Sequence, residues 1–243
     1  MKIIKLNAID STNNYLLELS RKETVEDVTV VVAEDQQKGR GQRENRWTSK
    51  AQKSLTFSVF KRFQDLSMQH QFSISMAVSL GIKKTLDRYE IPDVTIKWPN
   101  DIMSRSKKLA GILIENQTKG SMVVSSVIGV GMNVNEDHFN NLPLATSLYL
   151  IRGNQISREQ LLHDLTKTIA LELDRLKKVD LKTIHREFED YLFKRGVVSS
   201  FKQPNGKPFN GCILGVSRSG ELMIECEDEK VRTFRMKEIE YLF

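Results

Sequence analysis

The chain has 243 residues, of which 40% are hydrophobic and 28% charged, and its formal net charge is +6. This composition is typical of a globular protein with one sizeable core, or one core and a small appendage, and it argues against disorder, while the basic charge indicates an anionic partner. Because no apolar run approaches the roughly 20 residues of a membrane-spanning helix, and the N-terminus lacks a signal peptide's apolar region, we expect a cytoplasmic protein without a membrane partner.

The N-terminal part predicts a strand, a helix and two further strands. Residues 2–6 indicate a short strand, and the polar run at 11–13 offers capping side chains just before a helical spacing of apolar residues. Residues 28–33 are almost wholly apolar, as in a buried central strand. Residues 54–60 alternate between apolar and polar, which predicts a strand with one core face.

A cationic loop, residues 35–53, connects the last two strands. Gly39 and Gly41 flank Arg40, so backbone N–H groups and positive charge could meet at a phosphate; the alternative is a mobile surface loop. The spacing matches neither the P-loop nor the dinucleotide fingerprint. Trp47 in the same loop either covers a flat ligand or anchors the loop to the core.

The middle of the chain predicts a helix over residues 71–88, whose apolar side chains recur on one face. Three strands are then expected, the first two joined by a polar turn at 104–107, and they cover residues 94–98, 109–115 and 122–130.

Polar residues gather where the first of these three strands ends. Pro99 fixes the exit of the strand, and Asn100 and Asp101 then present an amide and a carboxylate, either to a ligand or magnesium ion or only as turn residues. Lys108 then begins the next strand, so a hairpin from Asp101 to Leu109 would bring a carboxylate and an ammonium to one end of the sheet. Such a pair suits an α-phosphate whose charge must be neutralised during attack.

Two glycines, Gly129 and Gly131, leave one face of the third strand without side chains, so that a ligand or a helix can approach closely. The four histidines have no partner motif, and no Cys–His or Ser–His–Asp arrangement stands out. Covalent catalysis by the protein is therefore not expected, and positioning and electrostatics would have to supply the rate.

The C-terminal part predicts helices over residues 158–176 and 181–193, followed by a boundary near 195–196. Turn signals then separate short alternating runs that indicate a small β-barrel or sandwich, at residues 211–216, 221–226 and 231–235. Cys212 and Cys226 are too few for a disulfide scaffold and lack the spacing of a zinc site, so we expect two reduced core cysteines.

In their order along the chain, these motifs resemble those of the biotin–protein ligases. The resemblance extends from residue 1 to about residue 192, and the glycine loop with the Trp-Pro-Asn-Asp motif is highly specific as a pair. It rests on Ser11-Thr12-Asn13, the run from Glu34 to Gly41, Arg46-Trp47, the run from Lys97 to Asp101, the run from Lys108 to Gly111, and the run from Gly129 to Asn133.

The resemblance implies an α+β fold, a mixed sheet with flanking helices of the class II synthetase-like biotin/lipoate ligase type, over residues 1–193. A small SH3-like β-barrel would follow at residues 194–243. Some members of the family carry an N-terminal helix-turn-helix that binds DNA. Here the ligase motifs begin within the first dozen residues, so a monofunctional ligase without DNA binding is expected, and a homodimer is compatible with the resemblance.

The activity that the resemblance implies has two steps. The carboxylate of biotin attacks the α-phosphate of ATP to give biotinyl-5′-AMP and pyrophosphate, with Mg²⁺ as a cofactor. A lysine of a biotin carboxyl carrier protein then takes the biotinyl group.

The resemblance also assigns residues to the site. Lys108 and Arg40 would be catalytic, with Lys108 bridging the biotin carboxylate and the α-phosphate, and Asp101 would contact Mg²⁺. The biotin site would be formed by Ser11, Thr12, Asn13, Gln36, Gly39, Arg40, Gly41, Gln42 and Lys108. ATP and the adenylate would be contacted by Arg40, Gln42, Arg43, Trp47, Asn100, Asp101, Lys108 and Asn133.

Two loop positions depart from the pattern. Gln42 stands where many members carry a second arginine, and Glu44 where glycine is common. Retention of the adenylate would then depend more on Arg40, Arg43 and Lys108.

Three other functions compete with this interpretation. A lipoate or octanoyl attachment enzyme resembles biotin ligases in fold, but its arginine-arginine and triple-glycine motifs are absent here. A nucleic-acid-binding protein could use the basic loop and Trp47 as a stacking platform, although this leaves the Trp-Pro-Asn-Asp motif without a role. A non-catalytic β-domain scaffold should bind neither biotin nor ATP.

Overall fold

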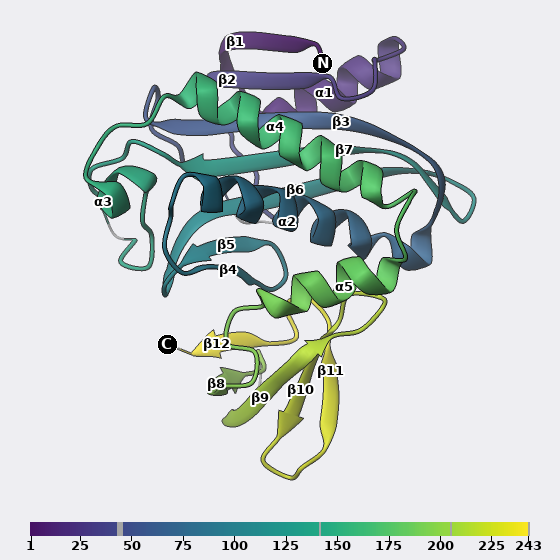
Figure 1. The fold of residues 1–243 in the computed structure, drawn as a ribbon, viewed down its shortest axis with the longest axis vertical. Coiled ribbons are helices and arrows are strands. Elements are labelled where there is room, and N and C mark those ends of the chain that lie inside the picture. The colour runs from purple at the N-terminus through teal and green to yellow at the C-terminus, as the bar shows by residue number, and fades with distance from the viewer. Residues whose placement is uncertain (43–45, 141, 205, 243) are drawn as a thin grey trace.

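A computed structural model describes residues 1–42, 46–140, 142–204 and 206–242 and contains two sheets (Figure 1). The large sheet comprises β1 (Ile3–Ile9), β2 (Val30–Gln36), β3 (Ser54–Ser67), β4 (Val94–Lys97), β5 (Asp101–Ser104), β6 (Lys107–Lys119) and β7 (Met122–Asn133). The small sheet comprises β8 (Val198–Lys202), β9 (Pro208–Val216), β10 (Leu222–Cys226), β11 (Val231–Phe234) and β12 (Glu240–Leu242). The helices are α1 (Thr12–Lys22), α2 (Phe72–Arg88), α3 (Leu148–Arg152), α4 (Arg158–Arg175) and α5 (Leu181–Asp190), with a 3-10 turn η1 (Met68–His70) before α2.

The large sheet has the strand order β1-β2-β3-β7-β6-β5-β4. Its first pair, β1 and β2, is parallel, and its other pairs are antiparallel. The sheet is therefore mixed, and with its helices it confirms the predicted α+β class.

Alternation along the strands gives the large sheet two buried faces. One face contributes Val30, Val59 and Ile128 to the main core, together with residues of α2 and α4. The other contributes Val31, Phe60 and Val127 to a smaller cluster with residues of α1. Figure 1 shows α2 and α4 side by side across the first face. On the second face α1 packs on β2, β3 and β7. It does not cover the part of this face that β6 and β5 form.

The structure corrects several of the sequence-based predictions. Asp101–Ser104 is a separate strand, so the turn at 104–107 joins β5 to β6 rather than β4 to β6. The short strand was missed because it is recognisable mainly by its pairing with both neighbours. The polar face of residues 54–60 is buried as well, since Ser58 contacts the start of α1. The helix predicted to reach residue 193 ends at Asp190, and β8, β12 and α3 were not anticipated.

The small sheet is antiparallel, with the order β11-β10-β9-β8-β12. It lies below α5 in Figure 1. Glu189 of α5 accepts a hydrogen bond from Val216 N at 2.9 Å, and Trp98 Nε1, at the end of β4, donates to Gly220 O at 2.8 Å. Cys212 and Cys226 are both free, as expected, but only Cys226 is buried. None of the helices in the described part of the chain is long and apolar enough to cross a membrane.

The close contact between α2 and α4 depends on Gly81. A Cβ at this position would lie 2.8 Å from Ile169 Cα and 3.1 Å from Ile169 N. Alanine favours helices by about 1 kcal/mol over glycine, but overpacking costs about 1–3 kcal/mol. Because the clashing atoms belong to the backbone of Ile169, the cost should lie in the upper part of this range, and we expect Gly81→Ala to lower the free energy of unfolding by about 1–2 kcal/mol in urea denaturation. Asp87→Ala, on the exposed side of α2, should change the free energy of unfolding by about 0.5–1 kcal/mol at most. A Gly81→Ala protein as stable as wild type would refute the packing argument.

Candidate active site

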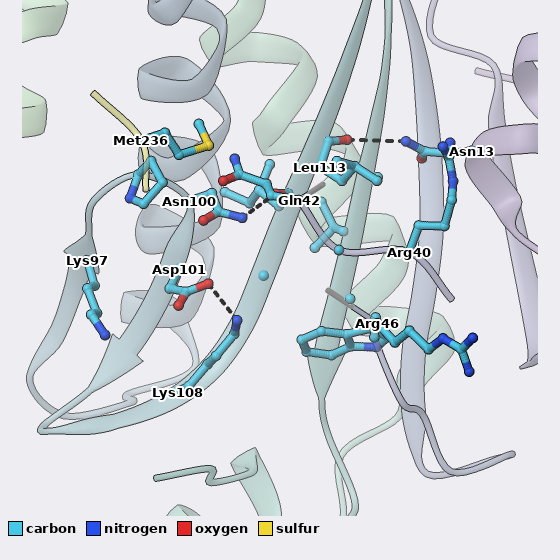
Figure 2. A pocket seen from close by; sticks show the side chains of 18 of the residues that line it. Asn13, Arg40, Gln42, Arg46, Lys97, Asn100, Asp101, Lys108, Leu113 and Met236 are labelled. Atoms are coloured by element: carbon cyan, nitrogen blue, oxygen red, sulfur yellow. Dashed lines mark hydrogen bonds and ion pairs between the residues drawn. The ribbon is translucent and has the colours of Figure 1, made fainter. Parts of the chain in front are cut away.

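A cavity of about 750 Å³ opens on the face of the large sheet that carries α1 (Figure 2). Segments distant in sequence line it: the start of α1, the loop that follows β2, the turn between β4 and β5, and the strands β3, β6 and β7. The small sheet and its connections line the cavity as well and contribute Pro204, Met236, Lys237, Ile239, Glu240 and Tyr241. Met236 and Asn100 are both labelled among the lining residues in Figure 2.

The floor of the cavity is made by residues that face each other across neighbouring strands. Gly131 of β7 pairs with Gly111 of β6, and Gly129 pairs with Leu113. A Cβ at Gly129 would collide with Asn13 Oδ1, and one at Gly131 would collide with the indole of Trp47. The two glycines therefore admit a helix start at one position and an aromatic ring at the other.

The start of α1 forms a buried polar network. Gln36 Oε1 accepts hydrogen bonds from Thr12 N at 3.0 Å and Thr12 Oγ1 at 3.2 Å. Ser58 Oγ lies 2.7 Å from Thr12 Oγ1 and 2.6 Å from Asn13 Oδ1. Ser11 occupies the N-cap position, but its side chain makes no capping hydrogen bond and it lines the cavity instead. The network fixes which atoms of these side chains a ligand can meet.

The glycine loop folds back on itself beside this network. Trp47 N donates to Gly39 O at 3.0 Å, and Arg40 and Arg46 form an isolated antiparallel bridge. Arg40 Nη2 donates to Glu115 Oε2 at 2.6 Å. The cavity is lined at this side by Arg40, Gly41, Gln42, Arg46 and Trp47, whereas Arg43 and Glu44 lie outside the described residues.

The indole of Trp47 lies over the glycine floor. Its Cζ3 would be 3.3 Å from a Cβ at Gly111, and Lys108 Nζ lies 5.7 Å from the ring centroid. Among the described residues, its Nε1–H is buried without a hydrogen-bond acceptor. Trp47 thus holds the loop against the glycine floor, as the anchoring alternative predicted, whereas its role in covering a flat ligand stays a prediction.

Lys108 and Asp101 meet in the cavity, as the sequence predicted. Lys108 Nζ lies 2.6 Å from Asp101 Oδ1 (Figure 2). The register of β5 and β6 shifts so that Ile102 pairs with Ala110 but Met103 pairs with Lys108, which leaves Leu109 as a bulge. Leu109 and Ala110 both enter the main core. The bulge therefore returns Lys108 to the face of Gly111, three residues away, where strict alternation would have placed it on the opposite face.

Two residues of the cavity wall have displaced pKa values that sequence analysis did not anticipate. Burial lowers the pKa of Lys97, an effect that Asp101 opposes and Lys108 and Lys194 reinforce. Burial and, less strongly, Asp101 raise the pKa of Tyr241. Lys97 Nζ lies 4.8 Å from the centroid of the Tyr241 ring. Lys97 belongs to a recognised motif, but no sequence signal pointed to the C-terminal residues.

Some residues assigned from the resemblance have contacts within the protein. Asn100 Nδ2 donates to Ile112 O at 2.8 Å, so its amide shapes the turn while the residue lines the cavity. Asn133 is buried and donates to Thr146 O at 2.9 Å. Asn133 and Gly39 do not line the cavity. Their roles as ligand residues stay predictions.

The residues around Asp101 could hold a metal ion only if most of its ligands came from outside the protein. Across the described ranges, no group of three or more His, Cys, Asp or Glu side chains could hold a metal ion. Mg²⁺ commonly takes one or two carboxylates and completes its shell with phosphate oxygens and waters. Asp101 is such a carboxylate, although Oδ1 already contacts Lys108.

Comparisons of the sequence and of the structure with known proteins find relatives of one kind. The model of a family described as Biotin/lipoate A/B protein ligase matches residues 6–133. The chain is 28% identical to the bifunctional ligase/repressor BirA of Bacillus spizizenii, over 93% of this chain and 70% of that protein. Over 53% of this chain and 39% of the relative, it is 35% identical to BirA of Escherichia coli. The solved biotin protein ligase from Aquifex aeolicus in complex with biotin and ATP superposes with a TM-score of 0.80 at 26% identity, covering 99% of this chain and 98% of that one.

The position of the Trp47 ring can be tested through the glycine beneath it. We expect Gly131→Ala to displace the indole, because the new Cβ would occupy the space of the ring. Acrylamide quenching of tryptophan fluorescence should then increase, since the other tryptophan, Trp98, is only 3% exposed. Gly120→Asn is the control: nothing lies within 4 Å of a Cβ at Gly120, and asparagine tolerates its positive φ. Unchanged quenching in Gly131→Ala would contradict the ring placement.

A buried carboxyl group lies where the loop joins β3. Glu136 is 2% exposed and accepts a hydrogen bond from Ser54 Oγ through Oε1, while within the described structure its Oε2 has no donor. Burial raises the pKa of Glu136, and the bond from Ser54 opposes this only in part. The folded protein therefore keeps the Glu136 proton at pH values where the unfolded chain has released it.

This raised pKa predicts a pH-dependent loss of stability. Its contribution is fully present below the ordinary carboxyl pKa and is lost as pH rises through the raised value. Glu136→Gln cannot ionise, so its free energy of unfolding should increase relative to wild type between about pH 4 and pH 7. Urea denaturation across that range measures the difference, with Glu34→Gln, at an exposed ion pair, as the control. A constant difference would exclude this role for Glu136.

Proposed function

Because the chain belongs to the biotin/lipoate A/B protein ligase family, we propose that it is an ATP-dependent biotin–protein ligase. It activates biotin to biotinyl-5′-AMP with release of pyrophosphate, and it transfers the biotinyl group to a lysine of a biotin carboxyl carrier protein. The likeness to named biotin protein ligases, one of them solved with biotin and ATP, supports the substrate. The observation in this chain that carries the proposal is the Lys108–Asp101 pair on a glycine floor.

The two sides of the cavity differ in chemistry as two substrates would require. At one side Asn13, Gln36 and Thr12 offer a small polar network beside the apolar Leu113. A ureido ring has one acceptor oxygen and two N–H donors, which such a network can pair. At the other side Lys108 and Lys97 supply positive charge for an anionic nucleotide.

Lys108 would act where the two substrates meet. Its ammonium group neutralises both the biotin carboxylate and the α-phosphate, which otherwise repel each other. A carboxylate oxygen then attacks the α-phosphorus, a C–O–P linkage forms, and the bond to pyrophosphate breaks. In the second step the uncharged amine of the acceptor lysine attacks the acyl carbon and AMP leaves. Arg40, from the loop, would stabilise the phosphate charge.

Magnesium belongs to this proposal as an ion that the nucleotide brings. Asp101 would supply the protein's carboxylate ligand, and phosphate oxygens would supply further ligands. The ion would neutralise phosphate charge, while Lys108 orients the Asp101 carboxylate through the ion pair at 2.6 Å.

We also infer that the chain divides into a catalytic domain, residues 1–193, and an SH3-like domain, residues 194–243. The five antiparallel strands after residue 197 support this division. The second domain would also form part of the ligand site, because residues between Met236 and Tyr241 line the cavity.

The competing functions make different use of the same features. A nucleic-acid-binding role would need the loop cations to be available to a backbone, but Arg40 is paired with Glu115 beside the cavity. A lipoate ligase would use the same fold, so it must be separated by substrate. Pyrophosphate release with biotin, lipoate or neither, measured side by side, makes that distinction.

Lys108 is the residue on which the proposed chemistry depends most. We expect Lys108→Ala to reduce biotin-dependent ATP–pyrophosphate exchange by at least about 100-fold, because the charge of two anions is left uncompensated. Lys107→Ala, at the exposed neighbouring position, should leave the exchange within about twofold of wild type. Gln42→Arg should also leave it intact. An active Lys108→Ala enzyme would refute the role given to this residue.

A further inference from the structure

Glu115 of β6 stands behind the cavity wall and belongs to none of the motifs recognised in the sequence. It follows Gly111 and Leu113 at alternate positions of β6, so all three side chains are directed to the same face of the sheet. Gly111 and Leu113 line the cavity, whereas Glu115 does not. Its side chain is 27% exposed, and it contacts two residues that line the cavity.

One oxygen of Glu115 makes both contacts. Oε2 accepts a hydrogen bond from Asn13 Nδ2 at 2.8 Å and from Arg40 Nη2 at 2.6 Å. Asn13 lies in the first turn of α1, and Arg40 belongs to the glycine loop. A single carboxylate therefore joins two segments that the chain itself does not connect directly. Both bonds are charge-assisted, which makes them stronger than bonds between neutral groups.

The contact with Glu115 also determines how Asn13 presents its amide. Asn13 Nδ2 donates to Glu115 and to Leu113 O at 3.3 Å, and Asn13 Oδ1 lies 2.6 Å from Ser58 Oγ. With both amide hydrogens used, only the oxygen has a lone pair left for a ligand. Glu115 is thus one of two acceptors that keep this orientation.

We propose that Glu115 is a positioning residue that anchors the glycine loop through Arg40 and orients Asn13, so that the two sides of the ligand site are set by one carboxylate. The identity of the ligand at Asn13 rests on the proposed biotin ligase function, whereas the anchoring of the loop does not. Glu115 needs its negative charge for Arg40 but only an acceptor oxygen for Asn13. Gln and Ala substitutions therefore separate its two tasks.

The loop contact is tested on the ligand-free protein by limited trypsin digestion. Cleavage after Arg40, followed by mass spectrometry, should be about two- to fivefold faster in Glu115→Gln, as expected for losing a partly exposed ion pair. Asp87→Asn is the matched control, because it removes the ion pair with Lys83, also at 2.6 Å, on α2, which packs against the opposite face of the sheet. Equal cleavage of wild type and Glu115→Gln would overturn the anchoring role.

Glu115→Asp provides a second variant should the glutamine protein fail to fold. It keeps the charge but is one methylene shorter, so it cannot reach Asn13 and Arg40 together as Glu115 does. Its cleavage after Arg40 should lie between that of wild type and Glu115→Gln. A rate equal to that of wild type would count against the shared anchor.

The orientation of Asn13 is tested by steady-state kinetics with biotin. Glu115→Ala should raise the KM for biotin about 5- to 10-fold, as expected for a lost hydrogen bond, and leave kcat within about twofold. Glu115→Gln should restore the KM for biotin, because its amide oxygen still accepts from Asn13, yet it should not restore resistance to trypsin. A raised KM for biotin together with a lowered kcat in both variants would indicate a merely structural residue. Failure of the proposed function would appear instead as wild-type protein without biotin turnover, with the trypsin result unaffected.

Discussion

Three glycines on two neighbouring strands, Gly111, Gly129 and Gly131, keep one patch on a face of the large sheet free of side chains at those positions. Everything else at the site depends on this space. Asn13 approaches the strand at Gly129, and the indole of Trp47 lies against Gly131, where any Cβ would collide with them. The glycines therefore set how closely Asn13 and the Trp47 ring approach the sheet, and with them the shape of this part of the cavity.

Two of the cations around this floor are held in ion pairs within the protein. Asp101 pairs with Lys108, and Glu115 pairs with Arg40, so the net charge of +6 does not appear as unpaired cations at these two positions. Paired charges keep long side chains in one place and reduce the reorganisation needed when an anion arrives. The ion pairs are partly exposed, so a nucleotide phosphate can compete for either cation.

The small sheet is part of the same arrangement. Trp98 is 3% exposed and donates to Gly220 O, while the ring of Phe72 lies against Gly220. These contacts fix the C-terminal strands against the end of β4, where Met236 and Tyr241 reach the cavity. Burial lowers the pKa of Lys97, and Lys97 Nζ lies 4.8 Å from the centroid of the Tyr241 ring, so the small sheet borders the charged part of the site.

The sequence by itself determined most of the longer helices and strands and the identity of the main motifs. Helix and strand periods located α2, α4, β2 and β7, because those segments have long, regular apolar faces. The Asp101–Lys108 meeting followed from a hairpin. Only the tertiary structure decided which face Lys108 occupies, since the bulge at Leu109 reverses the alternation on which a prediction depends. Glu115 and Tyr241 likewise joined the site through contacts between segments more than 70 residues apart, and such contacts leave no local pattern in the chain.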